Sequence, residues 1–451
     1  MLKFIIMSLI GAFLFLVPIS DGSGAFNIPL GFAISWLGGA LNSVNVGGFG
    51  LIVLLACIII TVSFLGSLLA YTVKPAFIMD DEKLKDLFLC HPIYFISKAI
   101  AVVVAWMVFL DIGPDWLIGW DGGSLMLIEL ISSNGGLIAI FVVLGMLIPI
   151  LTDFGLMEFL GILIRKVVRA LFTVPGRSSV DLISSWFSSS AAGIIITRNQ
   201  HETGFYTDRE ASVICVNFAV VSLPFTFVIA STVELTAYFP LFYLVICITG
   251  ILLALVMPRI WPLRGIRDEY IPGVGKQIDE EVPPGTSMFS HAVTRATERA
   301  DKSTAGTVVQ AGVSNWLNIF MDLIPVIMAW GTIALILHYQ TPIFDWLSWP
   351  FRWYLELFRV QGAAEFAPAT IVGFIDMFIP ALLMGGDAPI ETRFILGTLS
   401  IVQIIYLAET GILILKSKLP LNIGHLAIIF LMRTVLALPV IVLLTRLLFN
   451  P

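Results

Sequence analysis

The sequence predicts an all-α integral membrane protein with about nine transmembrane helices, two re-entrant hairpins and inverted structural repeats. The chain has 451 residues, of which 58% are hydrophobic and 12% charged, whereas a soluble domain is about 25% charged. Its apolar runs approach the roughly 20 residues that a helix needs to cross a bilayer, and they lack the alternation of an outer-membrane barrel. This composition excludes a soluble globular enzyme, a disordered chain and a coiled coil.

Nine apolar runs are long enough to be read as membrane spans. The first follows Lys3 and resembles a signal peptide, but it lacks a small-residue cleavage site, so we interpret it as a span. The predicted spans are 4–20, 49–73, 93–110, 139–163, 210–230, 238–258, 314–338, 394–415 and 424–446.

The basic residues predict the orientation of these spans. With a cytoplasmic N-terminus, 20 of the 25 Lys and Arg residues lie in or beside cytoplasmic segments, and the external stretches 21–48, 111–138 and 231–237 contain none. Cytoplasmic loops carry such a positive excess because basic loops are translocated poorly. We therefore expect a multi-pass protein of a bacterial inner (cytoplasmic) membrane, with its C-terminus outside.

Two semi-apolar segments, 178–197 and 364–386, must each enter and leave the membrane on the same side to keep this orientation. If either crossed fully, Lys416, or the basic residues of 259–302, would lie outside. We therefore predict two re-entrant hairpins. Such backbone is tolerated at membrane depth only where protein buries it or where it lines a wet cavity.

A polar stretch rich in Gly and Pro, 259–313, divides the chain and is predicted to be a cytoplasmic linker. The expected organisation is N-terminal membrane helices in 1–138, a first repeat in 139–258, the linker, and a second repeat in 314–451.

The repeat is indicated by four landmarks in the same order. LIPI at 147–150 with FG at 154–155 matches LIPV at 323–326 with WG at 330–331, and LFTVPG at 171–176 matches LFRVQG at 357–362. Arg209 and Arg393 then precede a span, and Pro240 and Pro420 each open the last span. The predicted topology inverts the second copy, as in many secondary transporters.

These repeated elements, with VPGRSS at 174–179 and GGDAPIETR at 385–393, resemble the Gate, or nucleoside-recognition, domain. That superfamily includes concentrative nucleoside transporters, the gate regions of ferrous-iron permeases and spore-maturation proteins. The sequence is most similar to the YjiH/YjiG type of bacterial inner-membrane protein, over about 139–450. The resemblance implies a presumed transporter. The second motif lacks the Gly-Gln-Thr-Glu of nucleoside transporters, so the substrate stays open.

The first hairpin contains a predicted polar stripe on one helix face. Its members follow the spacing i, i+3, i+4 and i+7 and are Asp181, Ser184, Ser185 and Ser188. A carboxylate and hydroxyls on one face can bind a polar solute or, with freed carbonyls, Na⁺. The alternative is that small serines only allow close helix packing.

The second hairpin contains Glu365 and Asp376, which are eleven residues apart and would share one face of a continuous helix. Pro368 and Pro380 interrupt the hydrogen bonds of that helix and free carbonyl groups. This pattern favours a site for coupling H⁺ or Na⁺. The alternative for Glu365 is a position at the outer surface.

Further ionisable or polar side chains are predicted at depth. Asp153 and Asp322 flank the two LIP kinks, where each would face a central cavity and carry a proton, while Asn217 and Glu409 follow the hairpins. A salt bridge to Arg209, Arg393 or Arg433 is the alternative for the carboxylates.

Two arginines near the hairpins are candidate counter-charges. Arg393 lies beside Glu391, with which it could form a structural pair. If the substrate is an anion, Arg209 and Arg393 are the expected partners of its charge.

Together these features predict a secondary active transporter of a small polar organic solute, nucleoside-like, peptide or organic acid, driven by H⁺ or Na⁺. The alternatives are a gated ion or metal permease and a non-transporting scaffold subunit. No nucleophile-and-base set, cofactor motif, metal-ligand spacing or nucleic-acid patch is found, so an enzyme is not expected. The expected partners are the solute and the lipid bilayer, and a homo-oligomer stays open.

Overall fold

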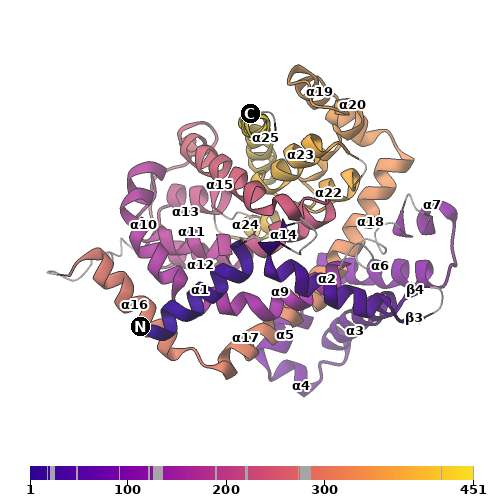
Figure 1. Cartoon of the computed structure of the whole chain (residues 1–451), viewed down its shortest axis with the longest axis horizontal. Coiled ribbons are helices and arrows are strands. Elements are labelled where there is room, and N and C mark those ends of the chain that lie inside the picture. Colours follow the sequence, from indigo (N-terminus) through magenta and orange to yellow (C-terminus); the bar gives the residue numbers. More distant parts are fainter. Residues whose placement is uncertain are drawn as a thin grey trace. The chain divides into compact units, whose positions relative to one another are not determined.

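The computed structural model describes the chain except residues 18, 21–25, 47–48, 91, 120–121, 125–135, 188–189, 219–221, 273, 275–285, 387, 418 and 450–451. It divides into two compact units. Unit 1 comprises Met1–Ile28, Ile148–Val308 and Phe351–Pro451, and unit 2 comprises Pro29–Leu147 and Val309–Pro350. Figure 1 shows that helices make up nearly all of the regular structure in both units.

The fold is all-helical with several membrane spans, as predicted. Within the described residues, six helical stretches are long and apolar enough to cross a membrane, and a bent helix pair makes a seventh if it counts as one span. The six are Leu51–Thr72, Pro92–Phe109, Thr236–Gly265, Ala305–Gln340, Ile390–Lys416 and Ile423–Phe449.

The other three predicted spans do not form single helices of span length. The first, α1 (Leu2–Leu16), has only 15 residues. The run 139–163 forms α9 (Gly136–Thr152) and α10 (Leu156–Phe172), which meet at an angle of 59° because Gly155 between them has φ +92°. The run 210–230 forms two ten-residue helices, α13 (Asp208–Asn217) and α14 (Leu223–Thr232). Among the described residues, these three predicted spans are therefore short, bent or interrupted.

Unit 1 contains both hairpin regions. Besides the helices already named, its elements are α11 (Ser178–Phe187), α12 (Ser190–Glu202), η1 (Thr236–Tyr238), α15 (Phe239–Val256), η2 (Met257–Arg259), η3 (Leu263–Gly265), α16 (Met288–Lys302), α20 (Ala363–Phe366), α21 (Ala369–Val372), α22 (Ile379–Met384), α23 (Ile390–Val402), the π-helix η5 (Leu407–Gly411), α24 (Ile412–Lys416) and α25 (Ile423–Phe449). Two short antiparallel strands, β1 (Ile19–Ser20) and β2 (Phe26–Asn27), pair with each other.

Unit 2 is built mainly from N-terminal helices. Its elements are α2 (Pro29–Asn42), the paired strands β3 (Asn45–Val46) and β4 (Phe49–Gly50), α3 (Leu51–Thr72), α4 (Ala76–Met79), α5 (Glu82–Phe88), α6 (Pro92–Phe109), α7 (Asp115–Ile118), the π-helix η4 (Ile319–Leu323) and α18 (Ile324–Gln340). The helices α9, α17 (Ala305–Asn318) and α19 (Ile343–Leu357) contain residues of both units.

The order of elements after residue 136 recurs after residue 319. A long helix, an amphipathic helix, a hairpin region, an interrupted helix and a last helix succeed one another in both halves. The amphipathic members are α10 and α19, the interrupted ones are α13–α14 and α23–η5–α24, and the last are α15 and α25. The inverted relation of the two halves stays a prediction.

The last helices of both halves pack against each other in unit 1. The helices α15, α23 and α25 are mutual neighbours (Figure 1), and the rings of Phe242 and Phe394 meet edge to face with centroids 5.4 Å apart. Both rings are fully buried. This aromatic contact holds α23 against α15 and so helps to position the polar groups near the end of α23.

Candidate functional site

The first hairpin region is a pair of helices, α11 and α12, in close contact. A Cβ atom added at Gly193 of α12 would lie 1.7 Å from Ser185 Oγ of α11. Only glycine therefore allows this approach with the present side chains. The tight packing holds the polar face of α11 at a fixed distance from α12.

Asp181 of α11 is buried, with 5% of its surface exposed. The hydroxyl of the fully buried Tyr206 donates a hydrogen bond to its carboxylate at 2.7 Å. In the described part of the chain, no Lys or Arg nitrogen lies within ion-pair distance of Asp181, although the charge of Arg177, four residues earlier, acts on its carboxylate. A buried carboxylate without a direct ion pair is costly in a membrane and marks a functional candidate.

The predicted serine stripe is only partly visible. The Ser185 hydroxyl donates to the backbone oxygen of Asp181 at 2.9 Å, so its hydrogen is used within its own helix. The side chain of Ser184 and the whole of Ser188 lie outside the described residues. The structure therefore supports Asp181 as a candidate more strongly than the serines.

The prediction that Glu365 and Asp376 share one helix face is wrong. The segment forms two one-turn helices, α20 and α21, and then irregular backbone before α22, because Pro368 and Pro380 cannot donate within a continuous helix. Glu365 is exposed, whereas Asp376 is buried and accepts a hydrogen bond from the Phe378 backbone N–H at 2.8 Å. Only Asp376 remains a candidate at depth.

The second interrupted helix breaks beside Asp376. α23 ends at Val402, Ile404 has a positive φ of 63°, and the chain resumes at Leu407 as the π-helix η5. The N–H groups of Leu407 and Ala408 donate to the carbonyls of Phe374 and Ile375, at 2.8 and 3.0 Å. Hairpin backbone and helix break thus satisfy each other's hydrogen bonds, as a helix broken at depth requires.

A chain of polar side chains links the first hairpin region to this break. The Ser190 hydroxyl at the start of α12 lies 2.7 Å from the Tyr406 hydroxyl, and that hydroxyl donates to Glu409 at 3.3 Å. Ser190 and Tyr406 are buried. The sequence indicated Glu409 but not Tyr406. The available signal was the position of Tyr406, three residues before a Glu predicted to lie in the membrane.

Arg433 connects the ends of both interrupted helices. Its Nε donates to the Val402 carbonyl at 2.8 Å, and its Nη1 donates to Asn217 Oδ1 at 2.9 Å and to the Val216 carbonyl at 3.3 Å. Arg433 is fully buried, and no carboxylate pairs with it among the described residues. The candidate Asn217 is therefore a hydrogen-bond partner of Arg433. The sequence indicated Arg433 only as a possible salt-bridge partner of the buried carboxylates.

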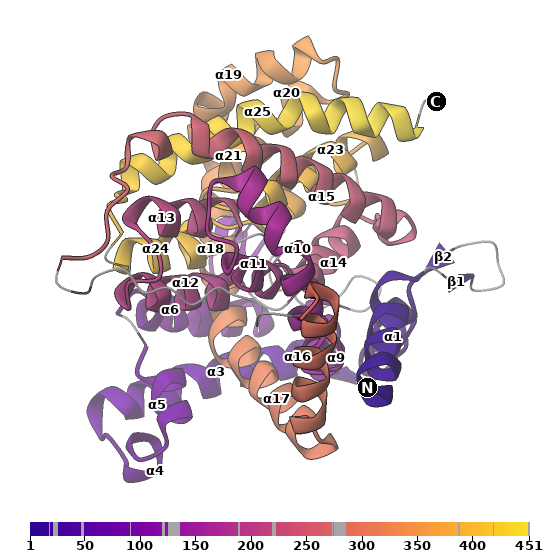
Figure 2. The same cartoon turned by 90° about the vertical axis from the view of Figure 1, so that its left-hand side faces the viewer.

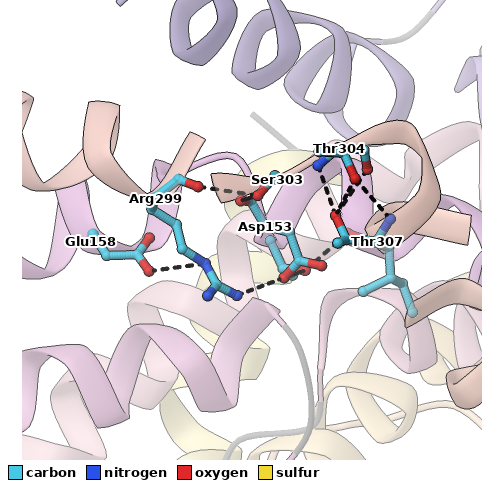
Figure 3. Close-up of polar contacts among 8 residues, drawn as sticks. Asp153, Glu158, Arg299, Ser303, Thr304 and Thr307 are labelled. Carbon is cyan, nitrogen blue, oxygen red and sulfur yellow. Dashed lines mark hydrogen bonds and ion pairs between the residues drawn. The ribbon is translucent and has the colours of Figure 1, made fainter. Parts of the chain in front are cut away.

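Asp153 does not pair with any of the arginines predicted for it. Arg299 of the linker helix α16 forms an ion pair with Asp153 at 3.2 Å and with Glu158 at 3.7 Å, as Figure 3 shows. Ser303 also donates to the Asp153 backbone oxygen, and α16 packs against α1 (Figure 2). Asp153 therefore binds the linker across the bend between α9 and α10.

The remaining charged candidates have structural partners. Glu391 pairs with Arg446 at 3.0 Å and not with Arg393, the partner that the sequence suggested. Arg393 pairs with Glu234 at 3.1 Å. Arg209 donates to the Pro258 carbonyl at 3.3 Å. In unit 2, Asp322 pairs with Lys98 at 2.7 Å, a partner that sequence reasoning did not name.

Comparisons with known proteins place the chain among related sequences. Residues 136–236 match the Gate family, described as nucleoside recognition. An uncharacterized protein of Alkalihalophilus pseudofirmus is 42% identical over 451 residues, covering 99% of this chain and 95% of the relative.

Solved structures of CNTnw are also similar. The inward-facing substrate-bound state is 16% identical, with a TM-score of 0.42, over 93% of this chain and 99% of that chain. An outward-facing variant is 15% identical, with a TM-score of 0.40, over 92% and 98%.

Proposed function

Because this chain belongs to the Gate-domain membrane protein family that includes the Alkalihalophilus pseudofirmus protein, we propose that it is a secondary active transporter. Its cargo is a small polar organic solute, and transport is coupled to H⁺ or Na⁺. By the distribution of its basic residues, it acts in a bacterial inner membrane with a cytoplasmic N-terminus.

The observation that carries this proposal is the pair of interrupted helices that meet at Arg433. Apolar helices normally cross a membrane unbroken, because each backbone hydrogen bond lost in lipid costs free energy. Here α13 ends at Asn217 and α23 at Val402, and Arg433 donates to backbone oxygens at both ends. Discontinuous helices of this kind form substrate and ion sites in secondary transporters.

The coupling ion is proposed to bind at Asp181 or Asp376. Each carboxylate is 5% exposed, Asp181 accepts a hydrogen bond from Tyr206 and Asp376 accepts one from the Phe378 backbone, and neither forms an ion pair in the described part of the chain. A carboxylate in that environment gains by binding H⁺ or Na⁺, since either cancels its charge. Asp181 lies in the first predicted repeat and Asp376 in the second. Movement of the two repeats against each other could therefore change the surroundings of both carboxylates.

The solute is proposed to contact Ser190, Tyr406 and Glu409. The Tyr406 hydroxyl lies within 3.3 Å of both the Ser190 hydroxyl and the Glu409 carboxylate, and the three groups offer donors and acceptors to a nucleoside, a short peptide or an organic acid. These three classes stay open.

Uptake into proteoliposomes tests the proposal. A thermal-shift screen with uridine, a dipeptide and succinate first selects the solute, and uptake is then measured under H⁺ and Na⁺ gradients. We expect Asp376→Asn to reduce gradient-driven uptake by about 5- to 150-fold, the range of ordinary coupling free energies. Glu365→Gln, an exposed acid of the same segment, is the matched control and should leave uptake unchanged.

Two results would contradict the proposal. Uptake that is flat for every solute under both gradients excludes a coupled transporter. Uptake equal in wild type, Asp181→Asn and Asp376→Asn would instead favour a role without ion coupling at these hairpins, as in a channel or a scaffold subunit.

A further inference from the structure

Unit 2 contains a buried cationic side chain that the proposed transport mechanism does not use. Lys98 lies in the apolar helix α6 and is fully buried. Three oxygen atoms surround its Nζ: Asp322 Oδ1 at 2.7 Å, Ser67 Oγ at 3.1 Å and the Leu87 carbonyl at 3.3 Å. Three acceptors match the three N–H donors of an ammonium group.

These groups come from four packed elements of the same unit. Ser67 belongs to α3, Leu87 to α5 and Asp322 to η4, and each of these elements contacts at least one of the others, with α3 also packed on α6. The enclosure is therefore built by tertiary packing of unit 2 alone.

The π-helix η4 has a local cause that explains how Asp322 reaches Lys98. Pro325 has no N–H, so the carbonyl four residues earlier, that of Met321, loses its helical donor. The hydroxyl of Ser63 on α3 donates to this carbonyl instead. The widened turn tied to α3 places the neighbouring Asp322 against the same helix, and π-turns often occur at functional sites.

The oxygen set has the chemistry of an alkali-cation site. A carboxylate, a hydroxyl and a main-chain carbonyl are the hard ligands that Na⁺ prefers where helices are irregular. The Asp322 side chain is 39% exposed and Lys98 0% exposed, but the Asp322 Oδ1 that contacts Lys98 is itself buried, so the ligating oxygen lies inside the enclosure. An ammonium at its centre supplies the single positive charge that a bound Na⁺ would supply.

We infer that Lys98 is the resident substitute for a monovalent cation in an oxygen-lined site formed by Ser67, Leu87 and Asp322. The site itself is competent to bind Na⁺ once the ammonium is removed. In the native protein the N-terminal helices thus provide a fixed charge here, and any coupling ion acts elsewhere. This inference does not depend on the proposed transport activity.

Thermal unfolding of the full-length protein in detergent tests the inference, with NaCl and choline chloride compared at equal ionic strength. Wild type gives the reference difference in melting temperature between the two salts, because Lys98 occupies this site. Lys98→Ala should melt lower than wild type in choline chloride and gain a few degrees more than wild type does in NaCl, since a ligand that binds only the folded state raises its stability.

Two further variants make the result specific. Lys98→Ala combined with Asp322→Asn should lose the sodium effect, because the site no longer carries a negative charge. Lys85→Ala, an exposed lysine of α5, is the matched control and should melt as wild type does in both salts.

If Lys98→Ala does not accumulate, Lys98→Ser replaces it, because serine also vacates the site and adds one oxygen. A difference between the two salts that is the same in the purified single variant as in wild type would overturn the inference and leave a structural ion pair. A sodium effect larger than that of wild type that persists without the Asp322 charge would also overturn it.

Discussion

The two interrupted helices of unit 1 share a backbone arrangement. The first breaks between Asn217 and Leu223, and the second between Val402 and Leu407. At both breaks the free carbonyls at the helix C-terminus receive hydrogen bonds from Arg433. A cation suits this place because helix C-termini carry partial negative charge.

The two helices differ in the residues on the far side of the break. The first resumes as α14, whose ten residues, LPFTFVIAST, include no ionisable side chain. The second resumes as the π-helix η5 with Glu409, directly after Tyr406. The backbone is therefore interrupted in a similar way at both breaks, but an ionisable side chain follows only the second of these two breaks. We expect changes common to both breaks to affect folding, and changes at the second break to affect uptake.

Arg433→Met should have the largest effect, because it removes a group that both breaks share. It leaves Asn217 and the carbonyls of Val402 and Val216 without these bonds, and a buried hydrogen bond to a charged group contributes about 1.5–3 kcal/mol. Thermal or denaturant unfolding in detergent measures the loss. Arg352→Met, whose side chain forms an exposed i,i+4 pair with Glu356, is the control and should cost about 0.5 kcal/mol or less. Equal stability of the two variants would refute the common role of Arg433.

Tyr406→Phe should separate the two breaks, with a smaller loss of stability than Arg433→Met. It removes one buried hydroxyl that contacts Ser190 and Glu409, which costs about 1 kcal/mol, but it should also reduce uptake of the solute. Tyr354→Phe is the matched control, because its hydroxyl donates to the Val435 carbonyl on α25 away from the breaks. If both variants transport as wild type does, the second break is structural like the first.

A double-mutant cycle sharpens this prediction. If Ser190 and Tyr406 act through their 2.7 Å contact, Ser190→Ala and the double variant with Tyr406→Phe should show a coupling energy of at least about 0.5 kcal/mol. Additive losses would show that the two hydroxyls act independently.

The sequence predicted the helical class because apolar runs long enough to span a membrane can be recognised from local composition alone. It did not predict the break within 210–230, since averaged hydropathy conceals a helix end and Pro224 was the only local signal. The shared face of Glu365 and Asp376 was wrong because that prediction assumed a continuous helix despite two prolines. In the first hairpin, the i, i+4 spacing correctly placed Asp181 and Ser185 on one helix.

Partners of the charged residues could not be predicted, because they depend on contacts between distant segments. Lys98 and Asp322 are far apart in the sequence, and Asp153 meets Arg299 of the predicted cytoplasmic linker. Spacing rules describe residues on one element, whereas these pairs arise from the packing of several. The same limit explains why Arg433 was not named as a site residue.

Arg393→Gln should have the smallest effect, although its ion pair with Glu234 joins segments of the two predicted repeats. Glu234 is 66% exposed, so water and salt screen the attraction, and such a pair contributes about 0.2–1 kcal/mol. Gln keeps an amide donor for the Val233 carbonyl, which Arg393 also binds at 3.0 Å. The variant should therefore melt slightly lower at low ionic strength and match wild type at about 1 M salt, where the screening length is about 3 Å. A larger loss that persists in high salt would mean that this contact, like Arg433, holds the repeats together. The structural role assigned to the first break would then extend to the pair of Arg393 and Glu234.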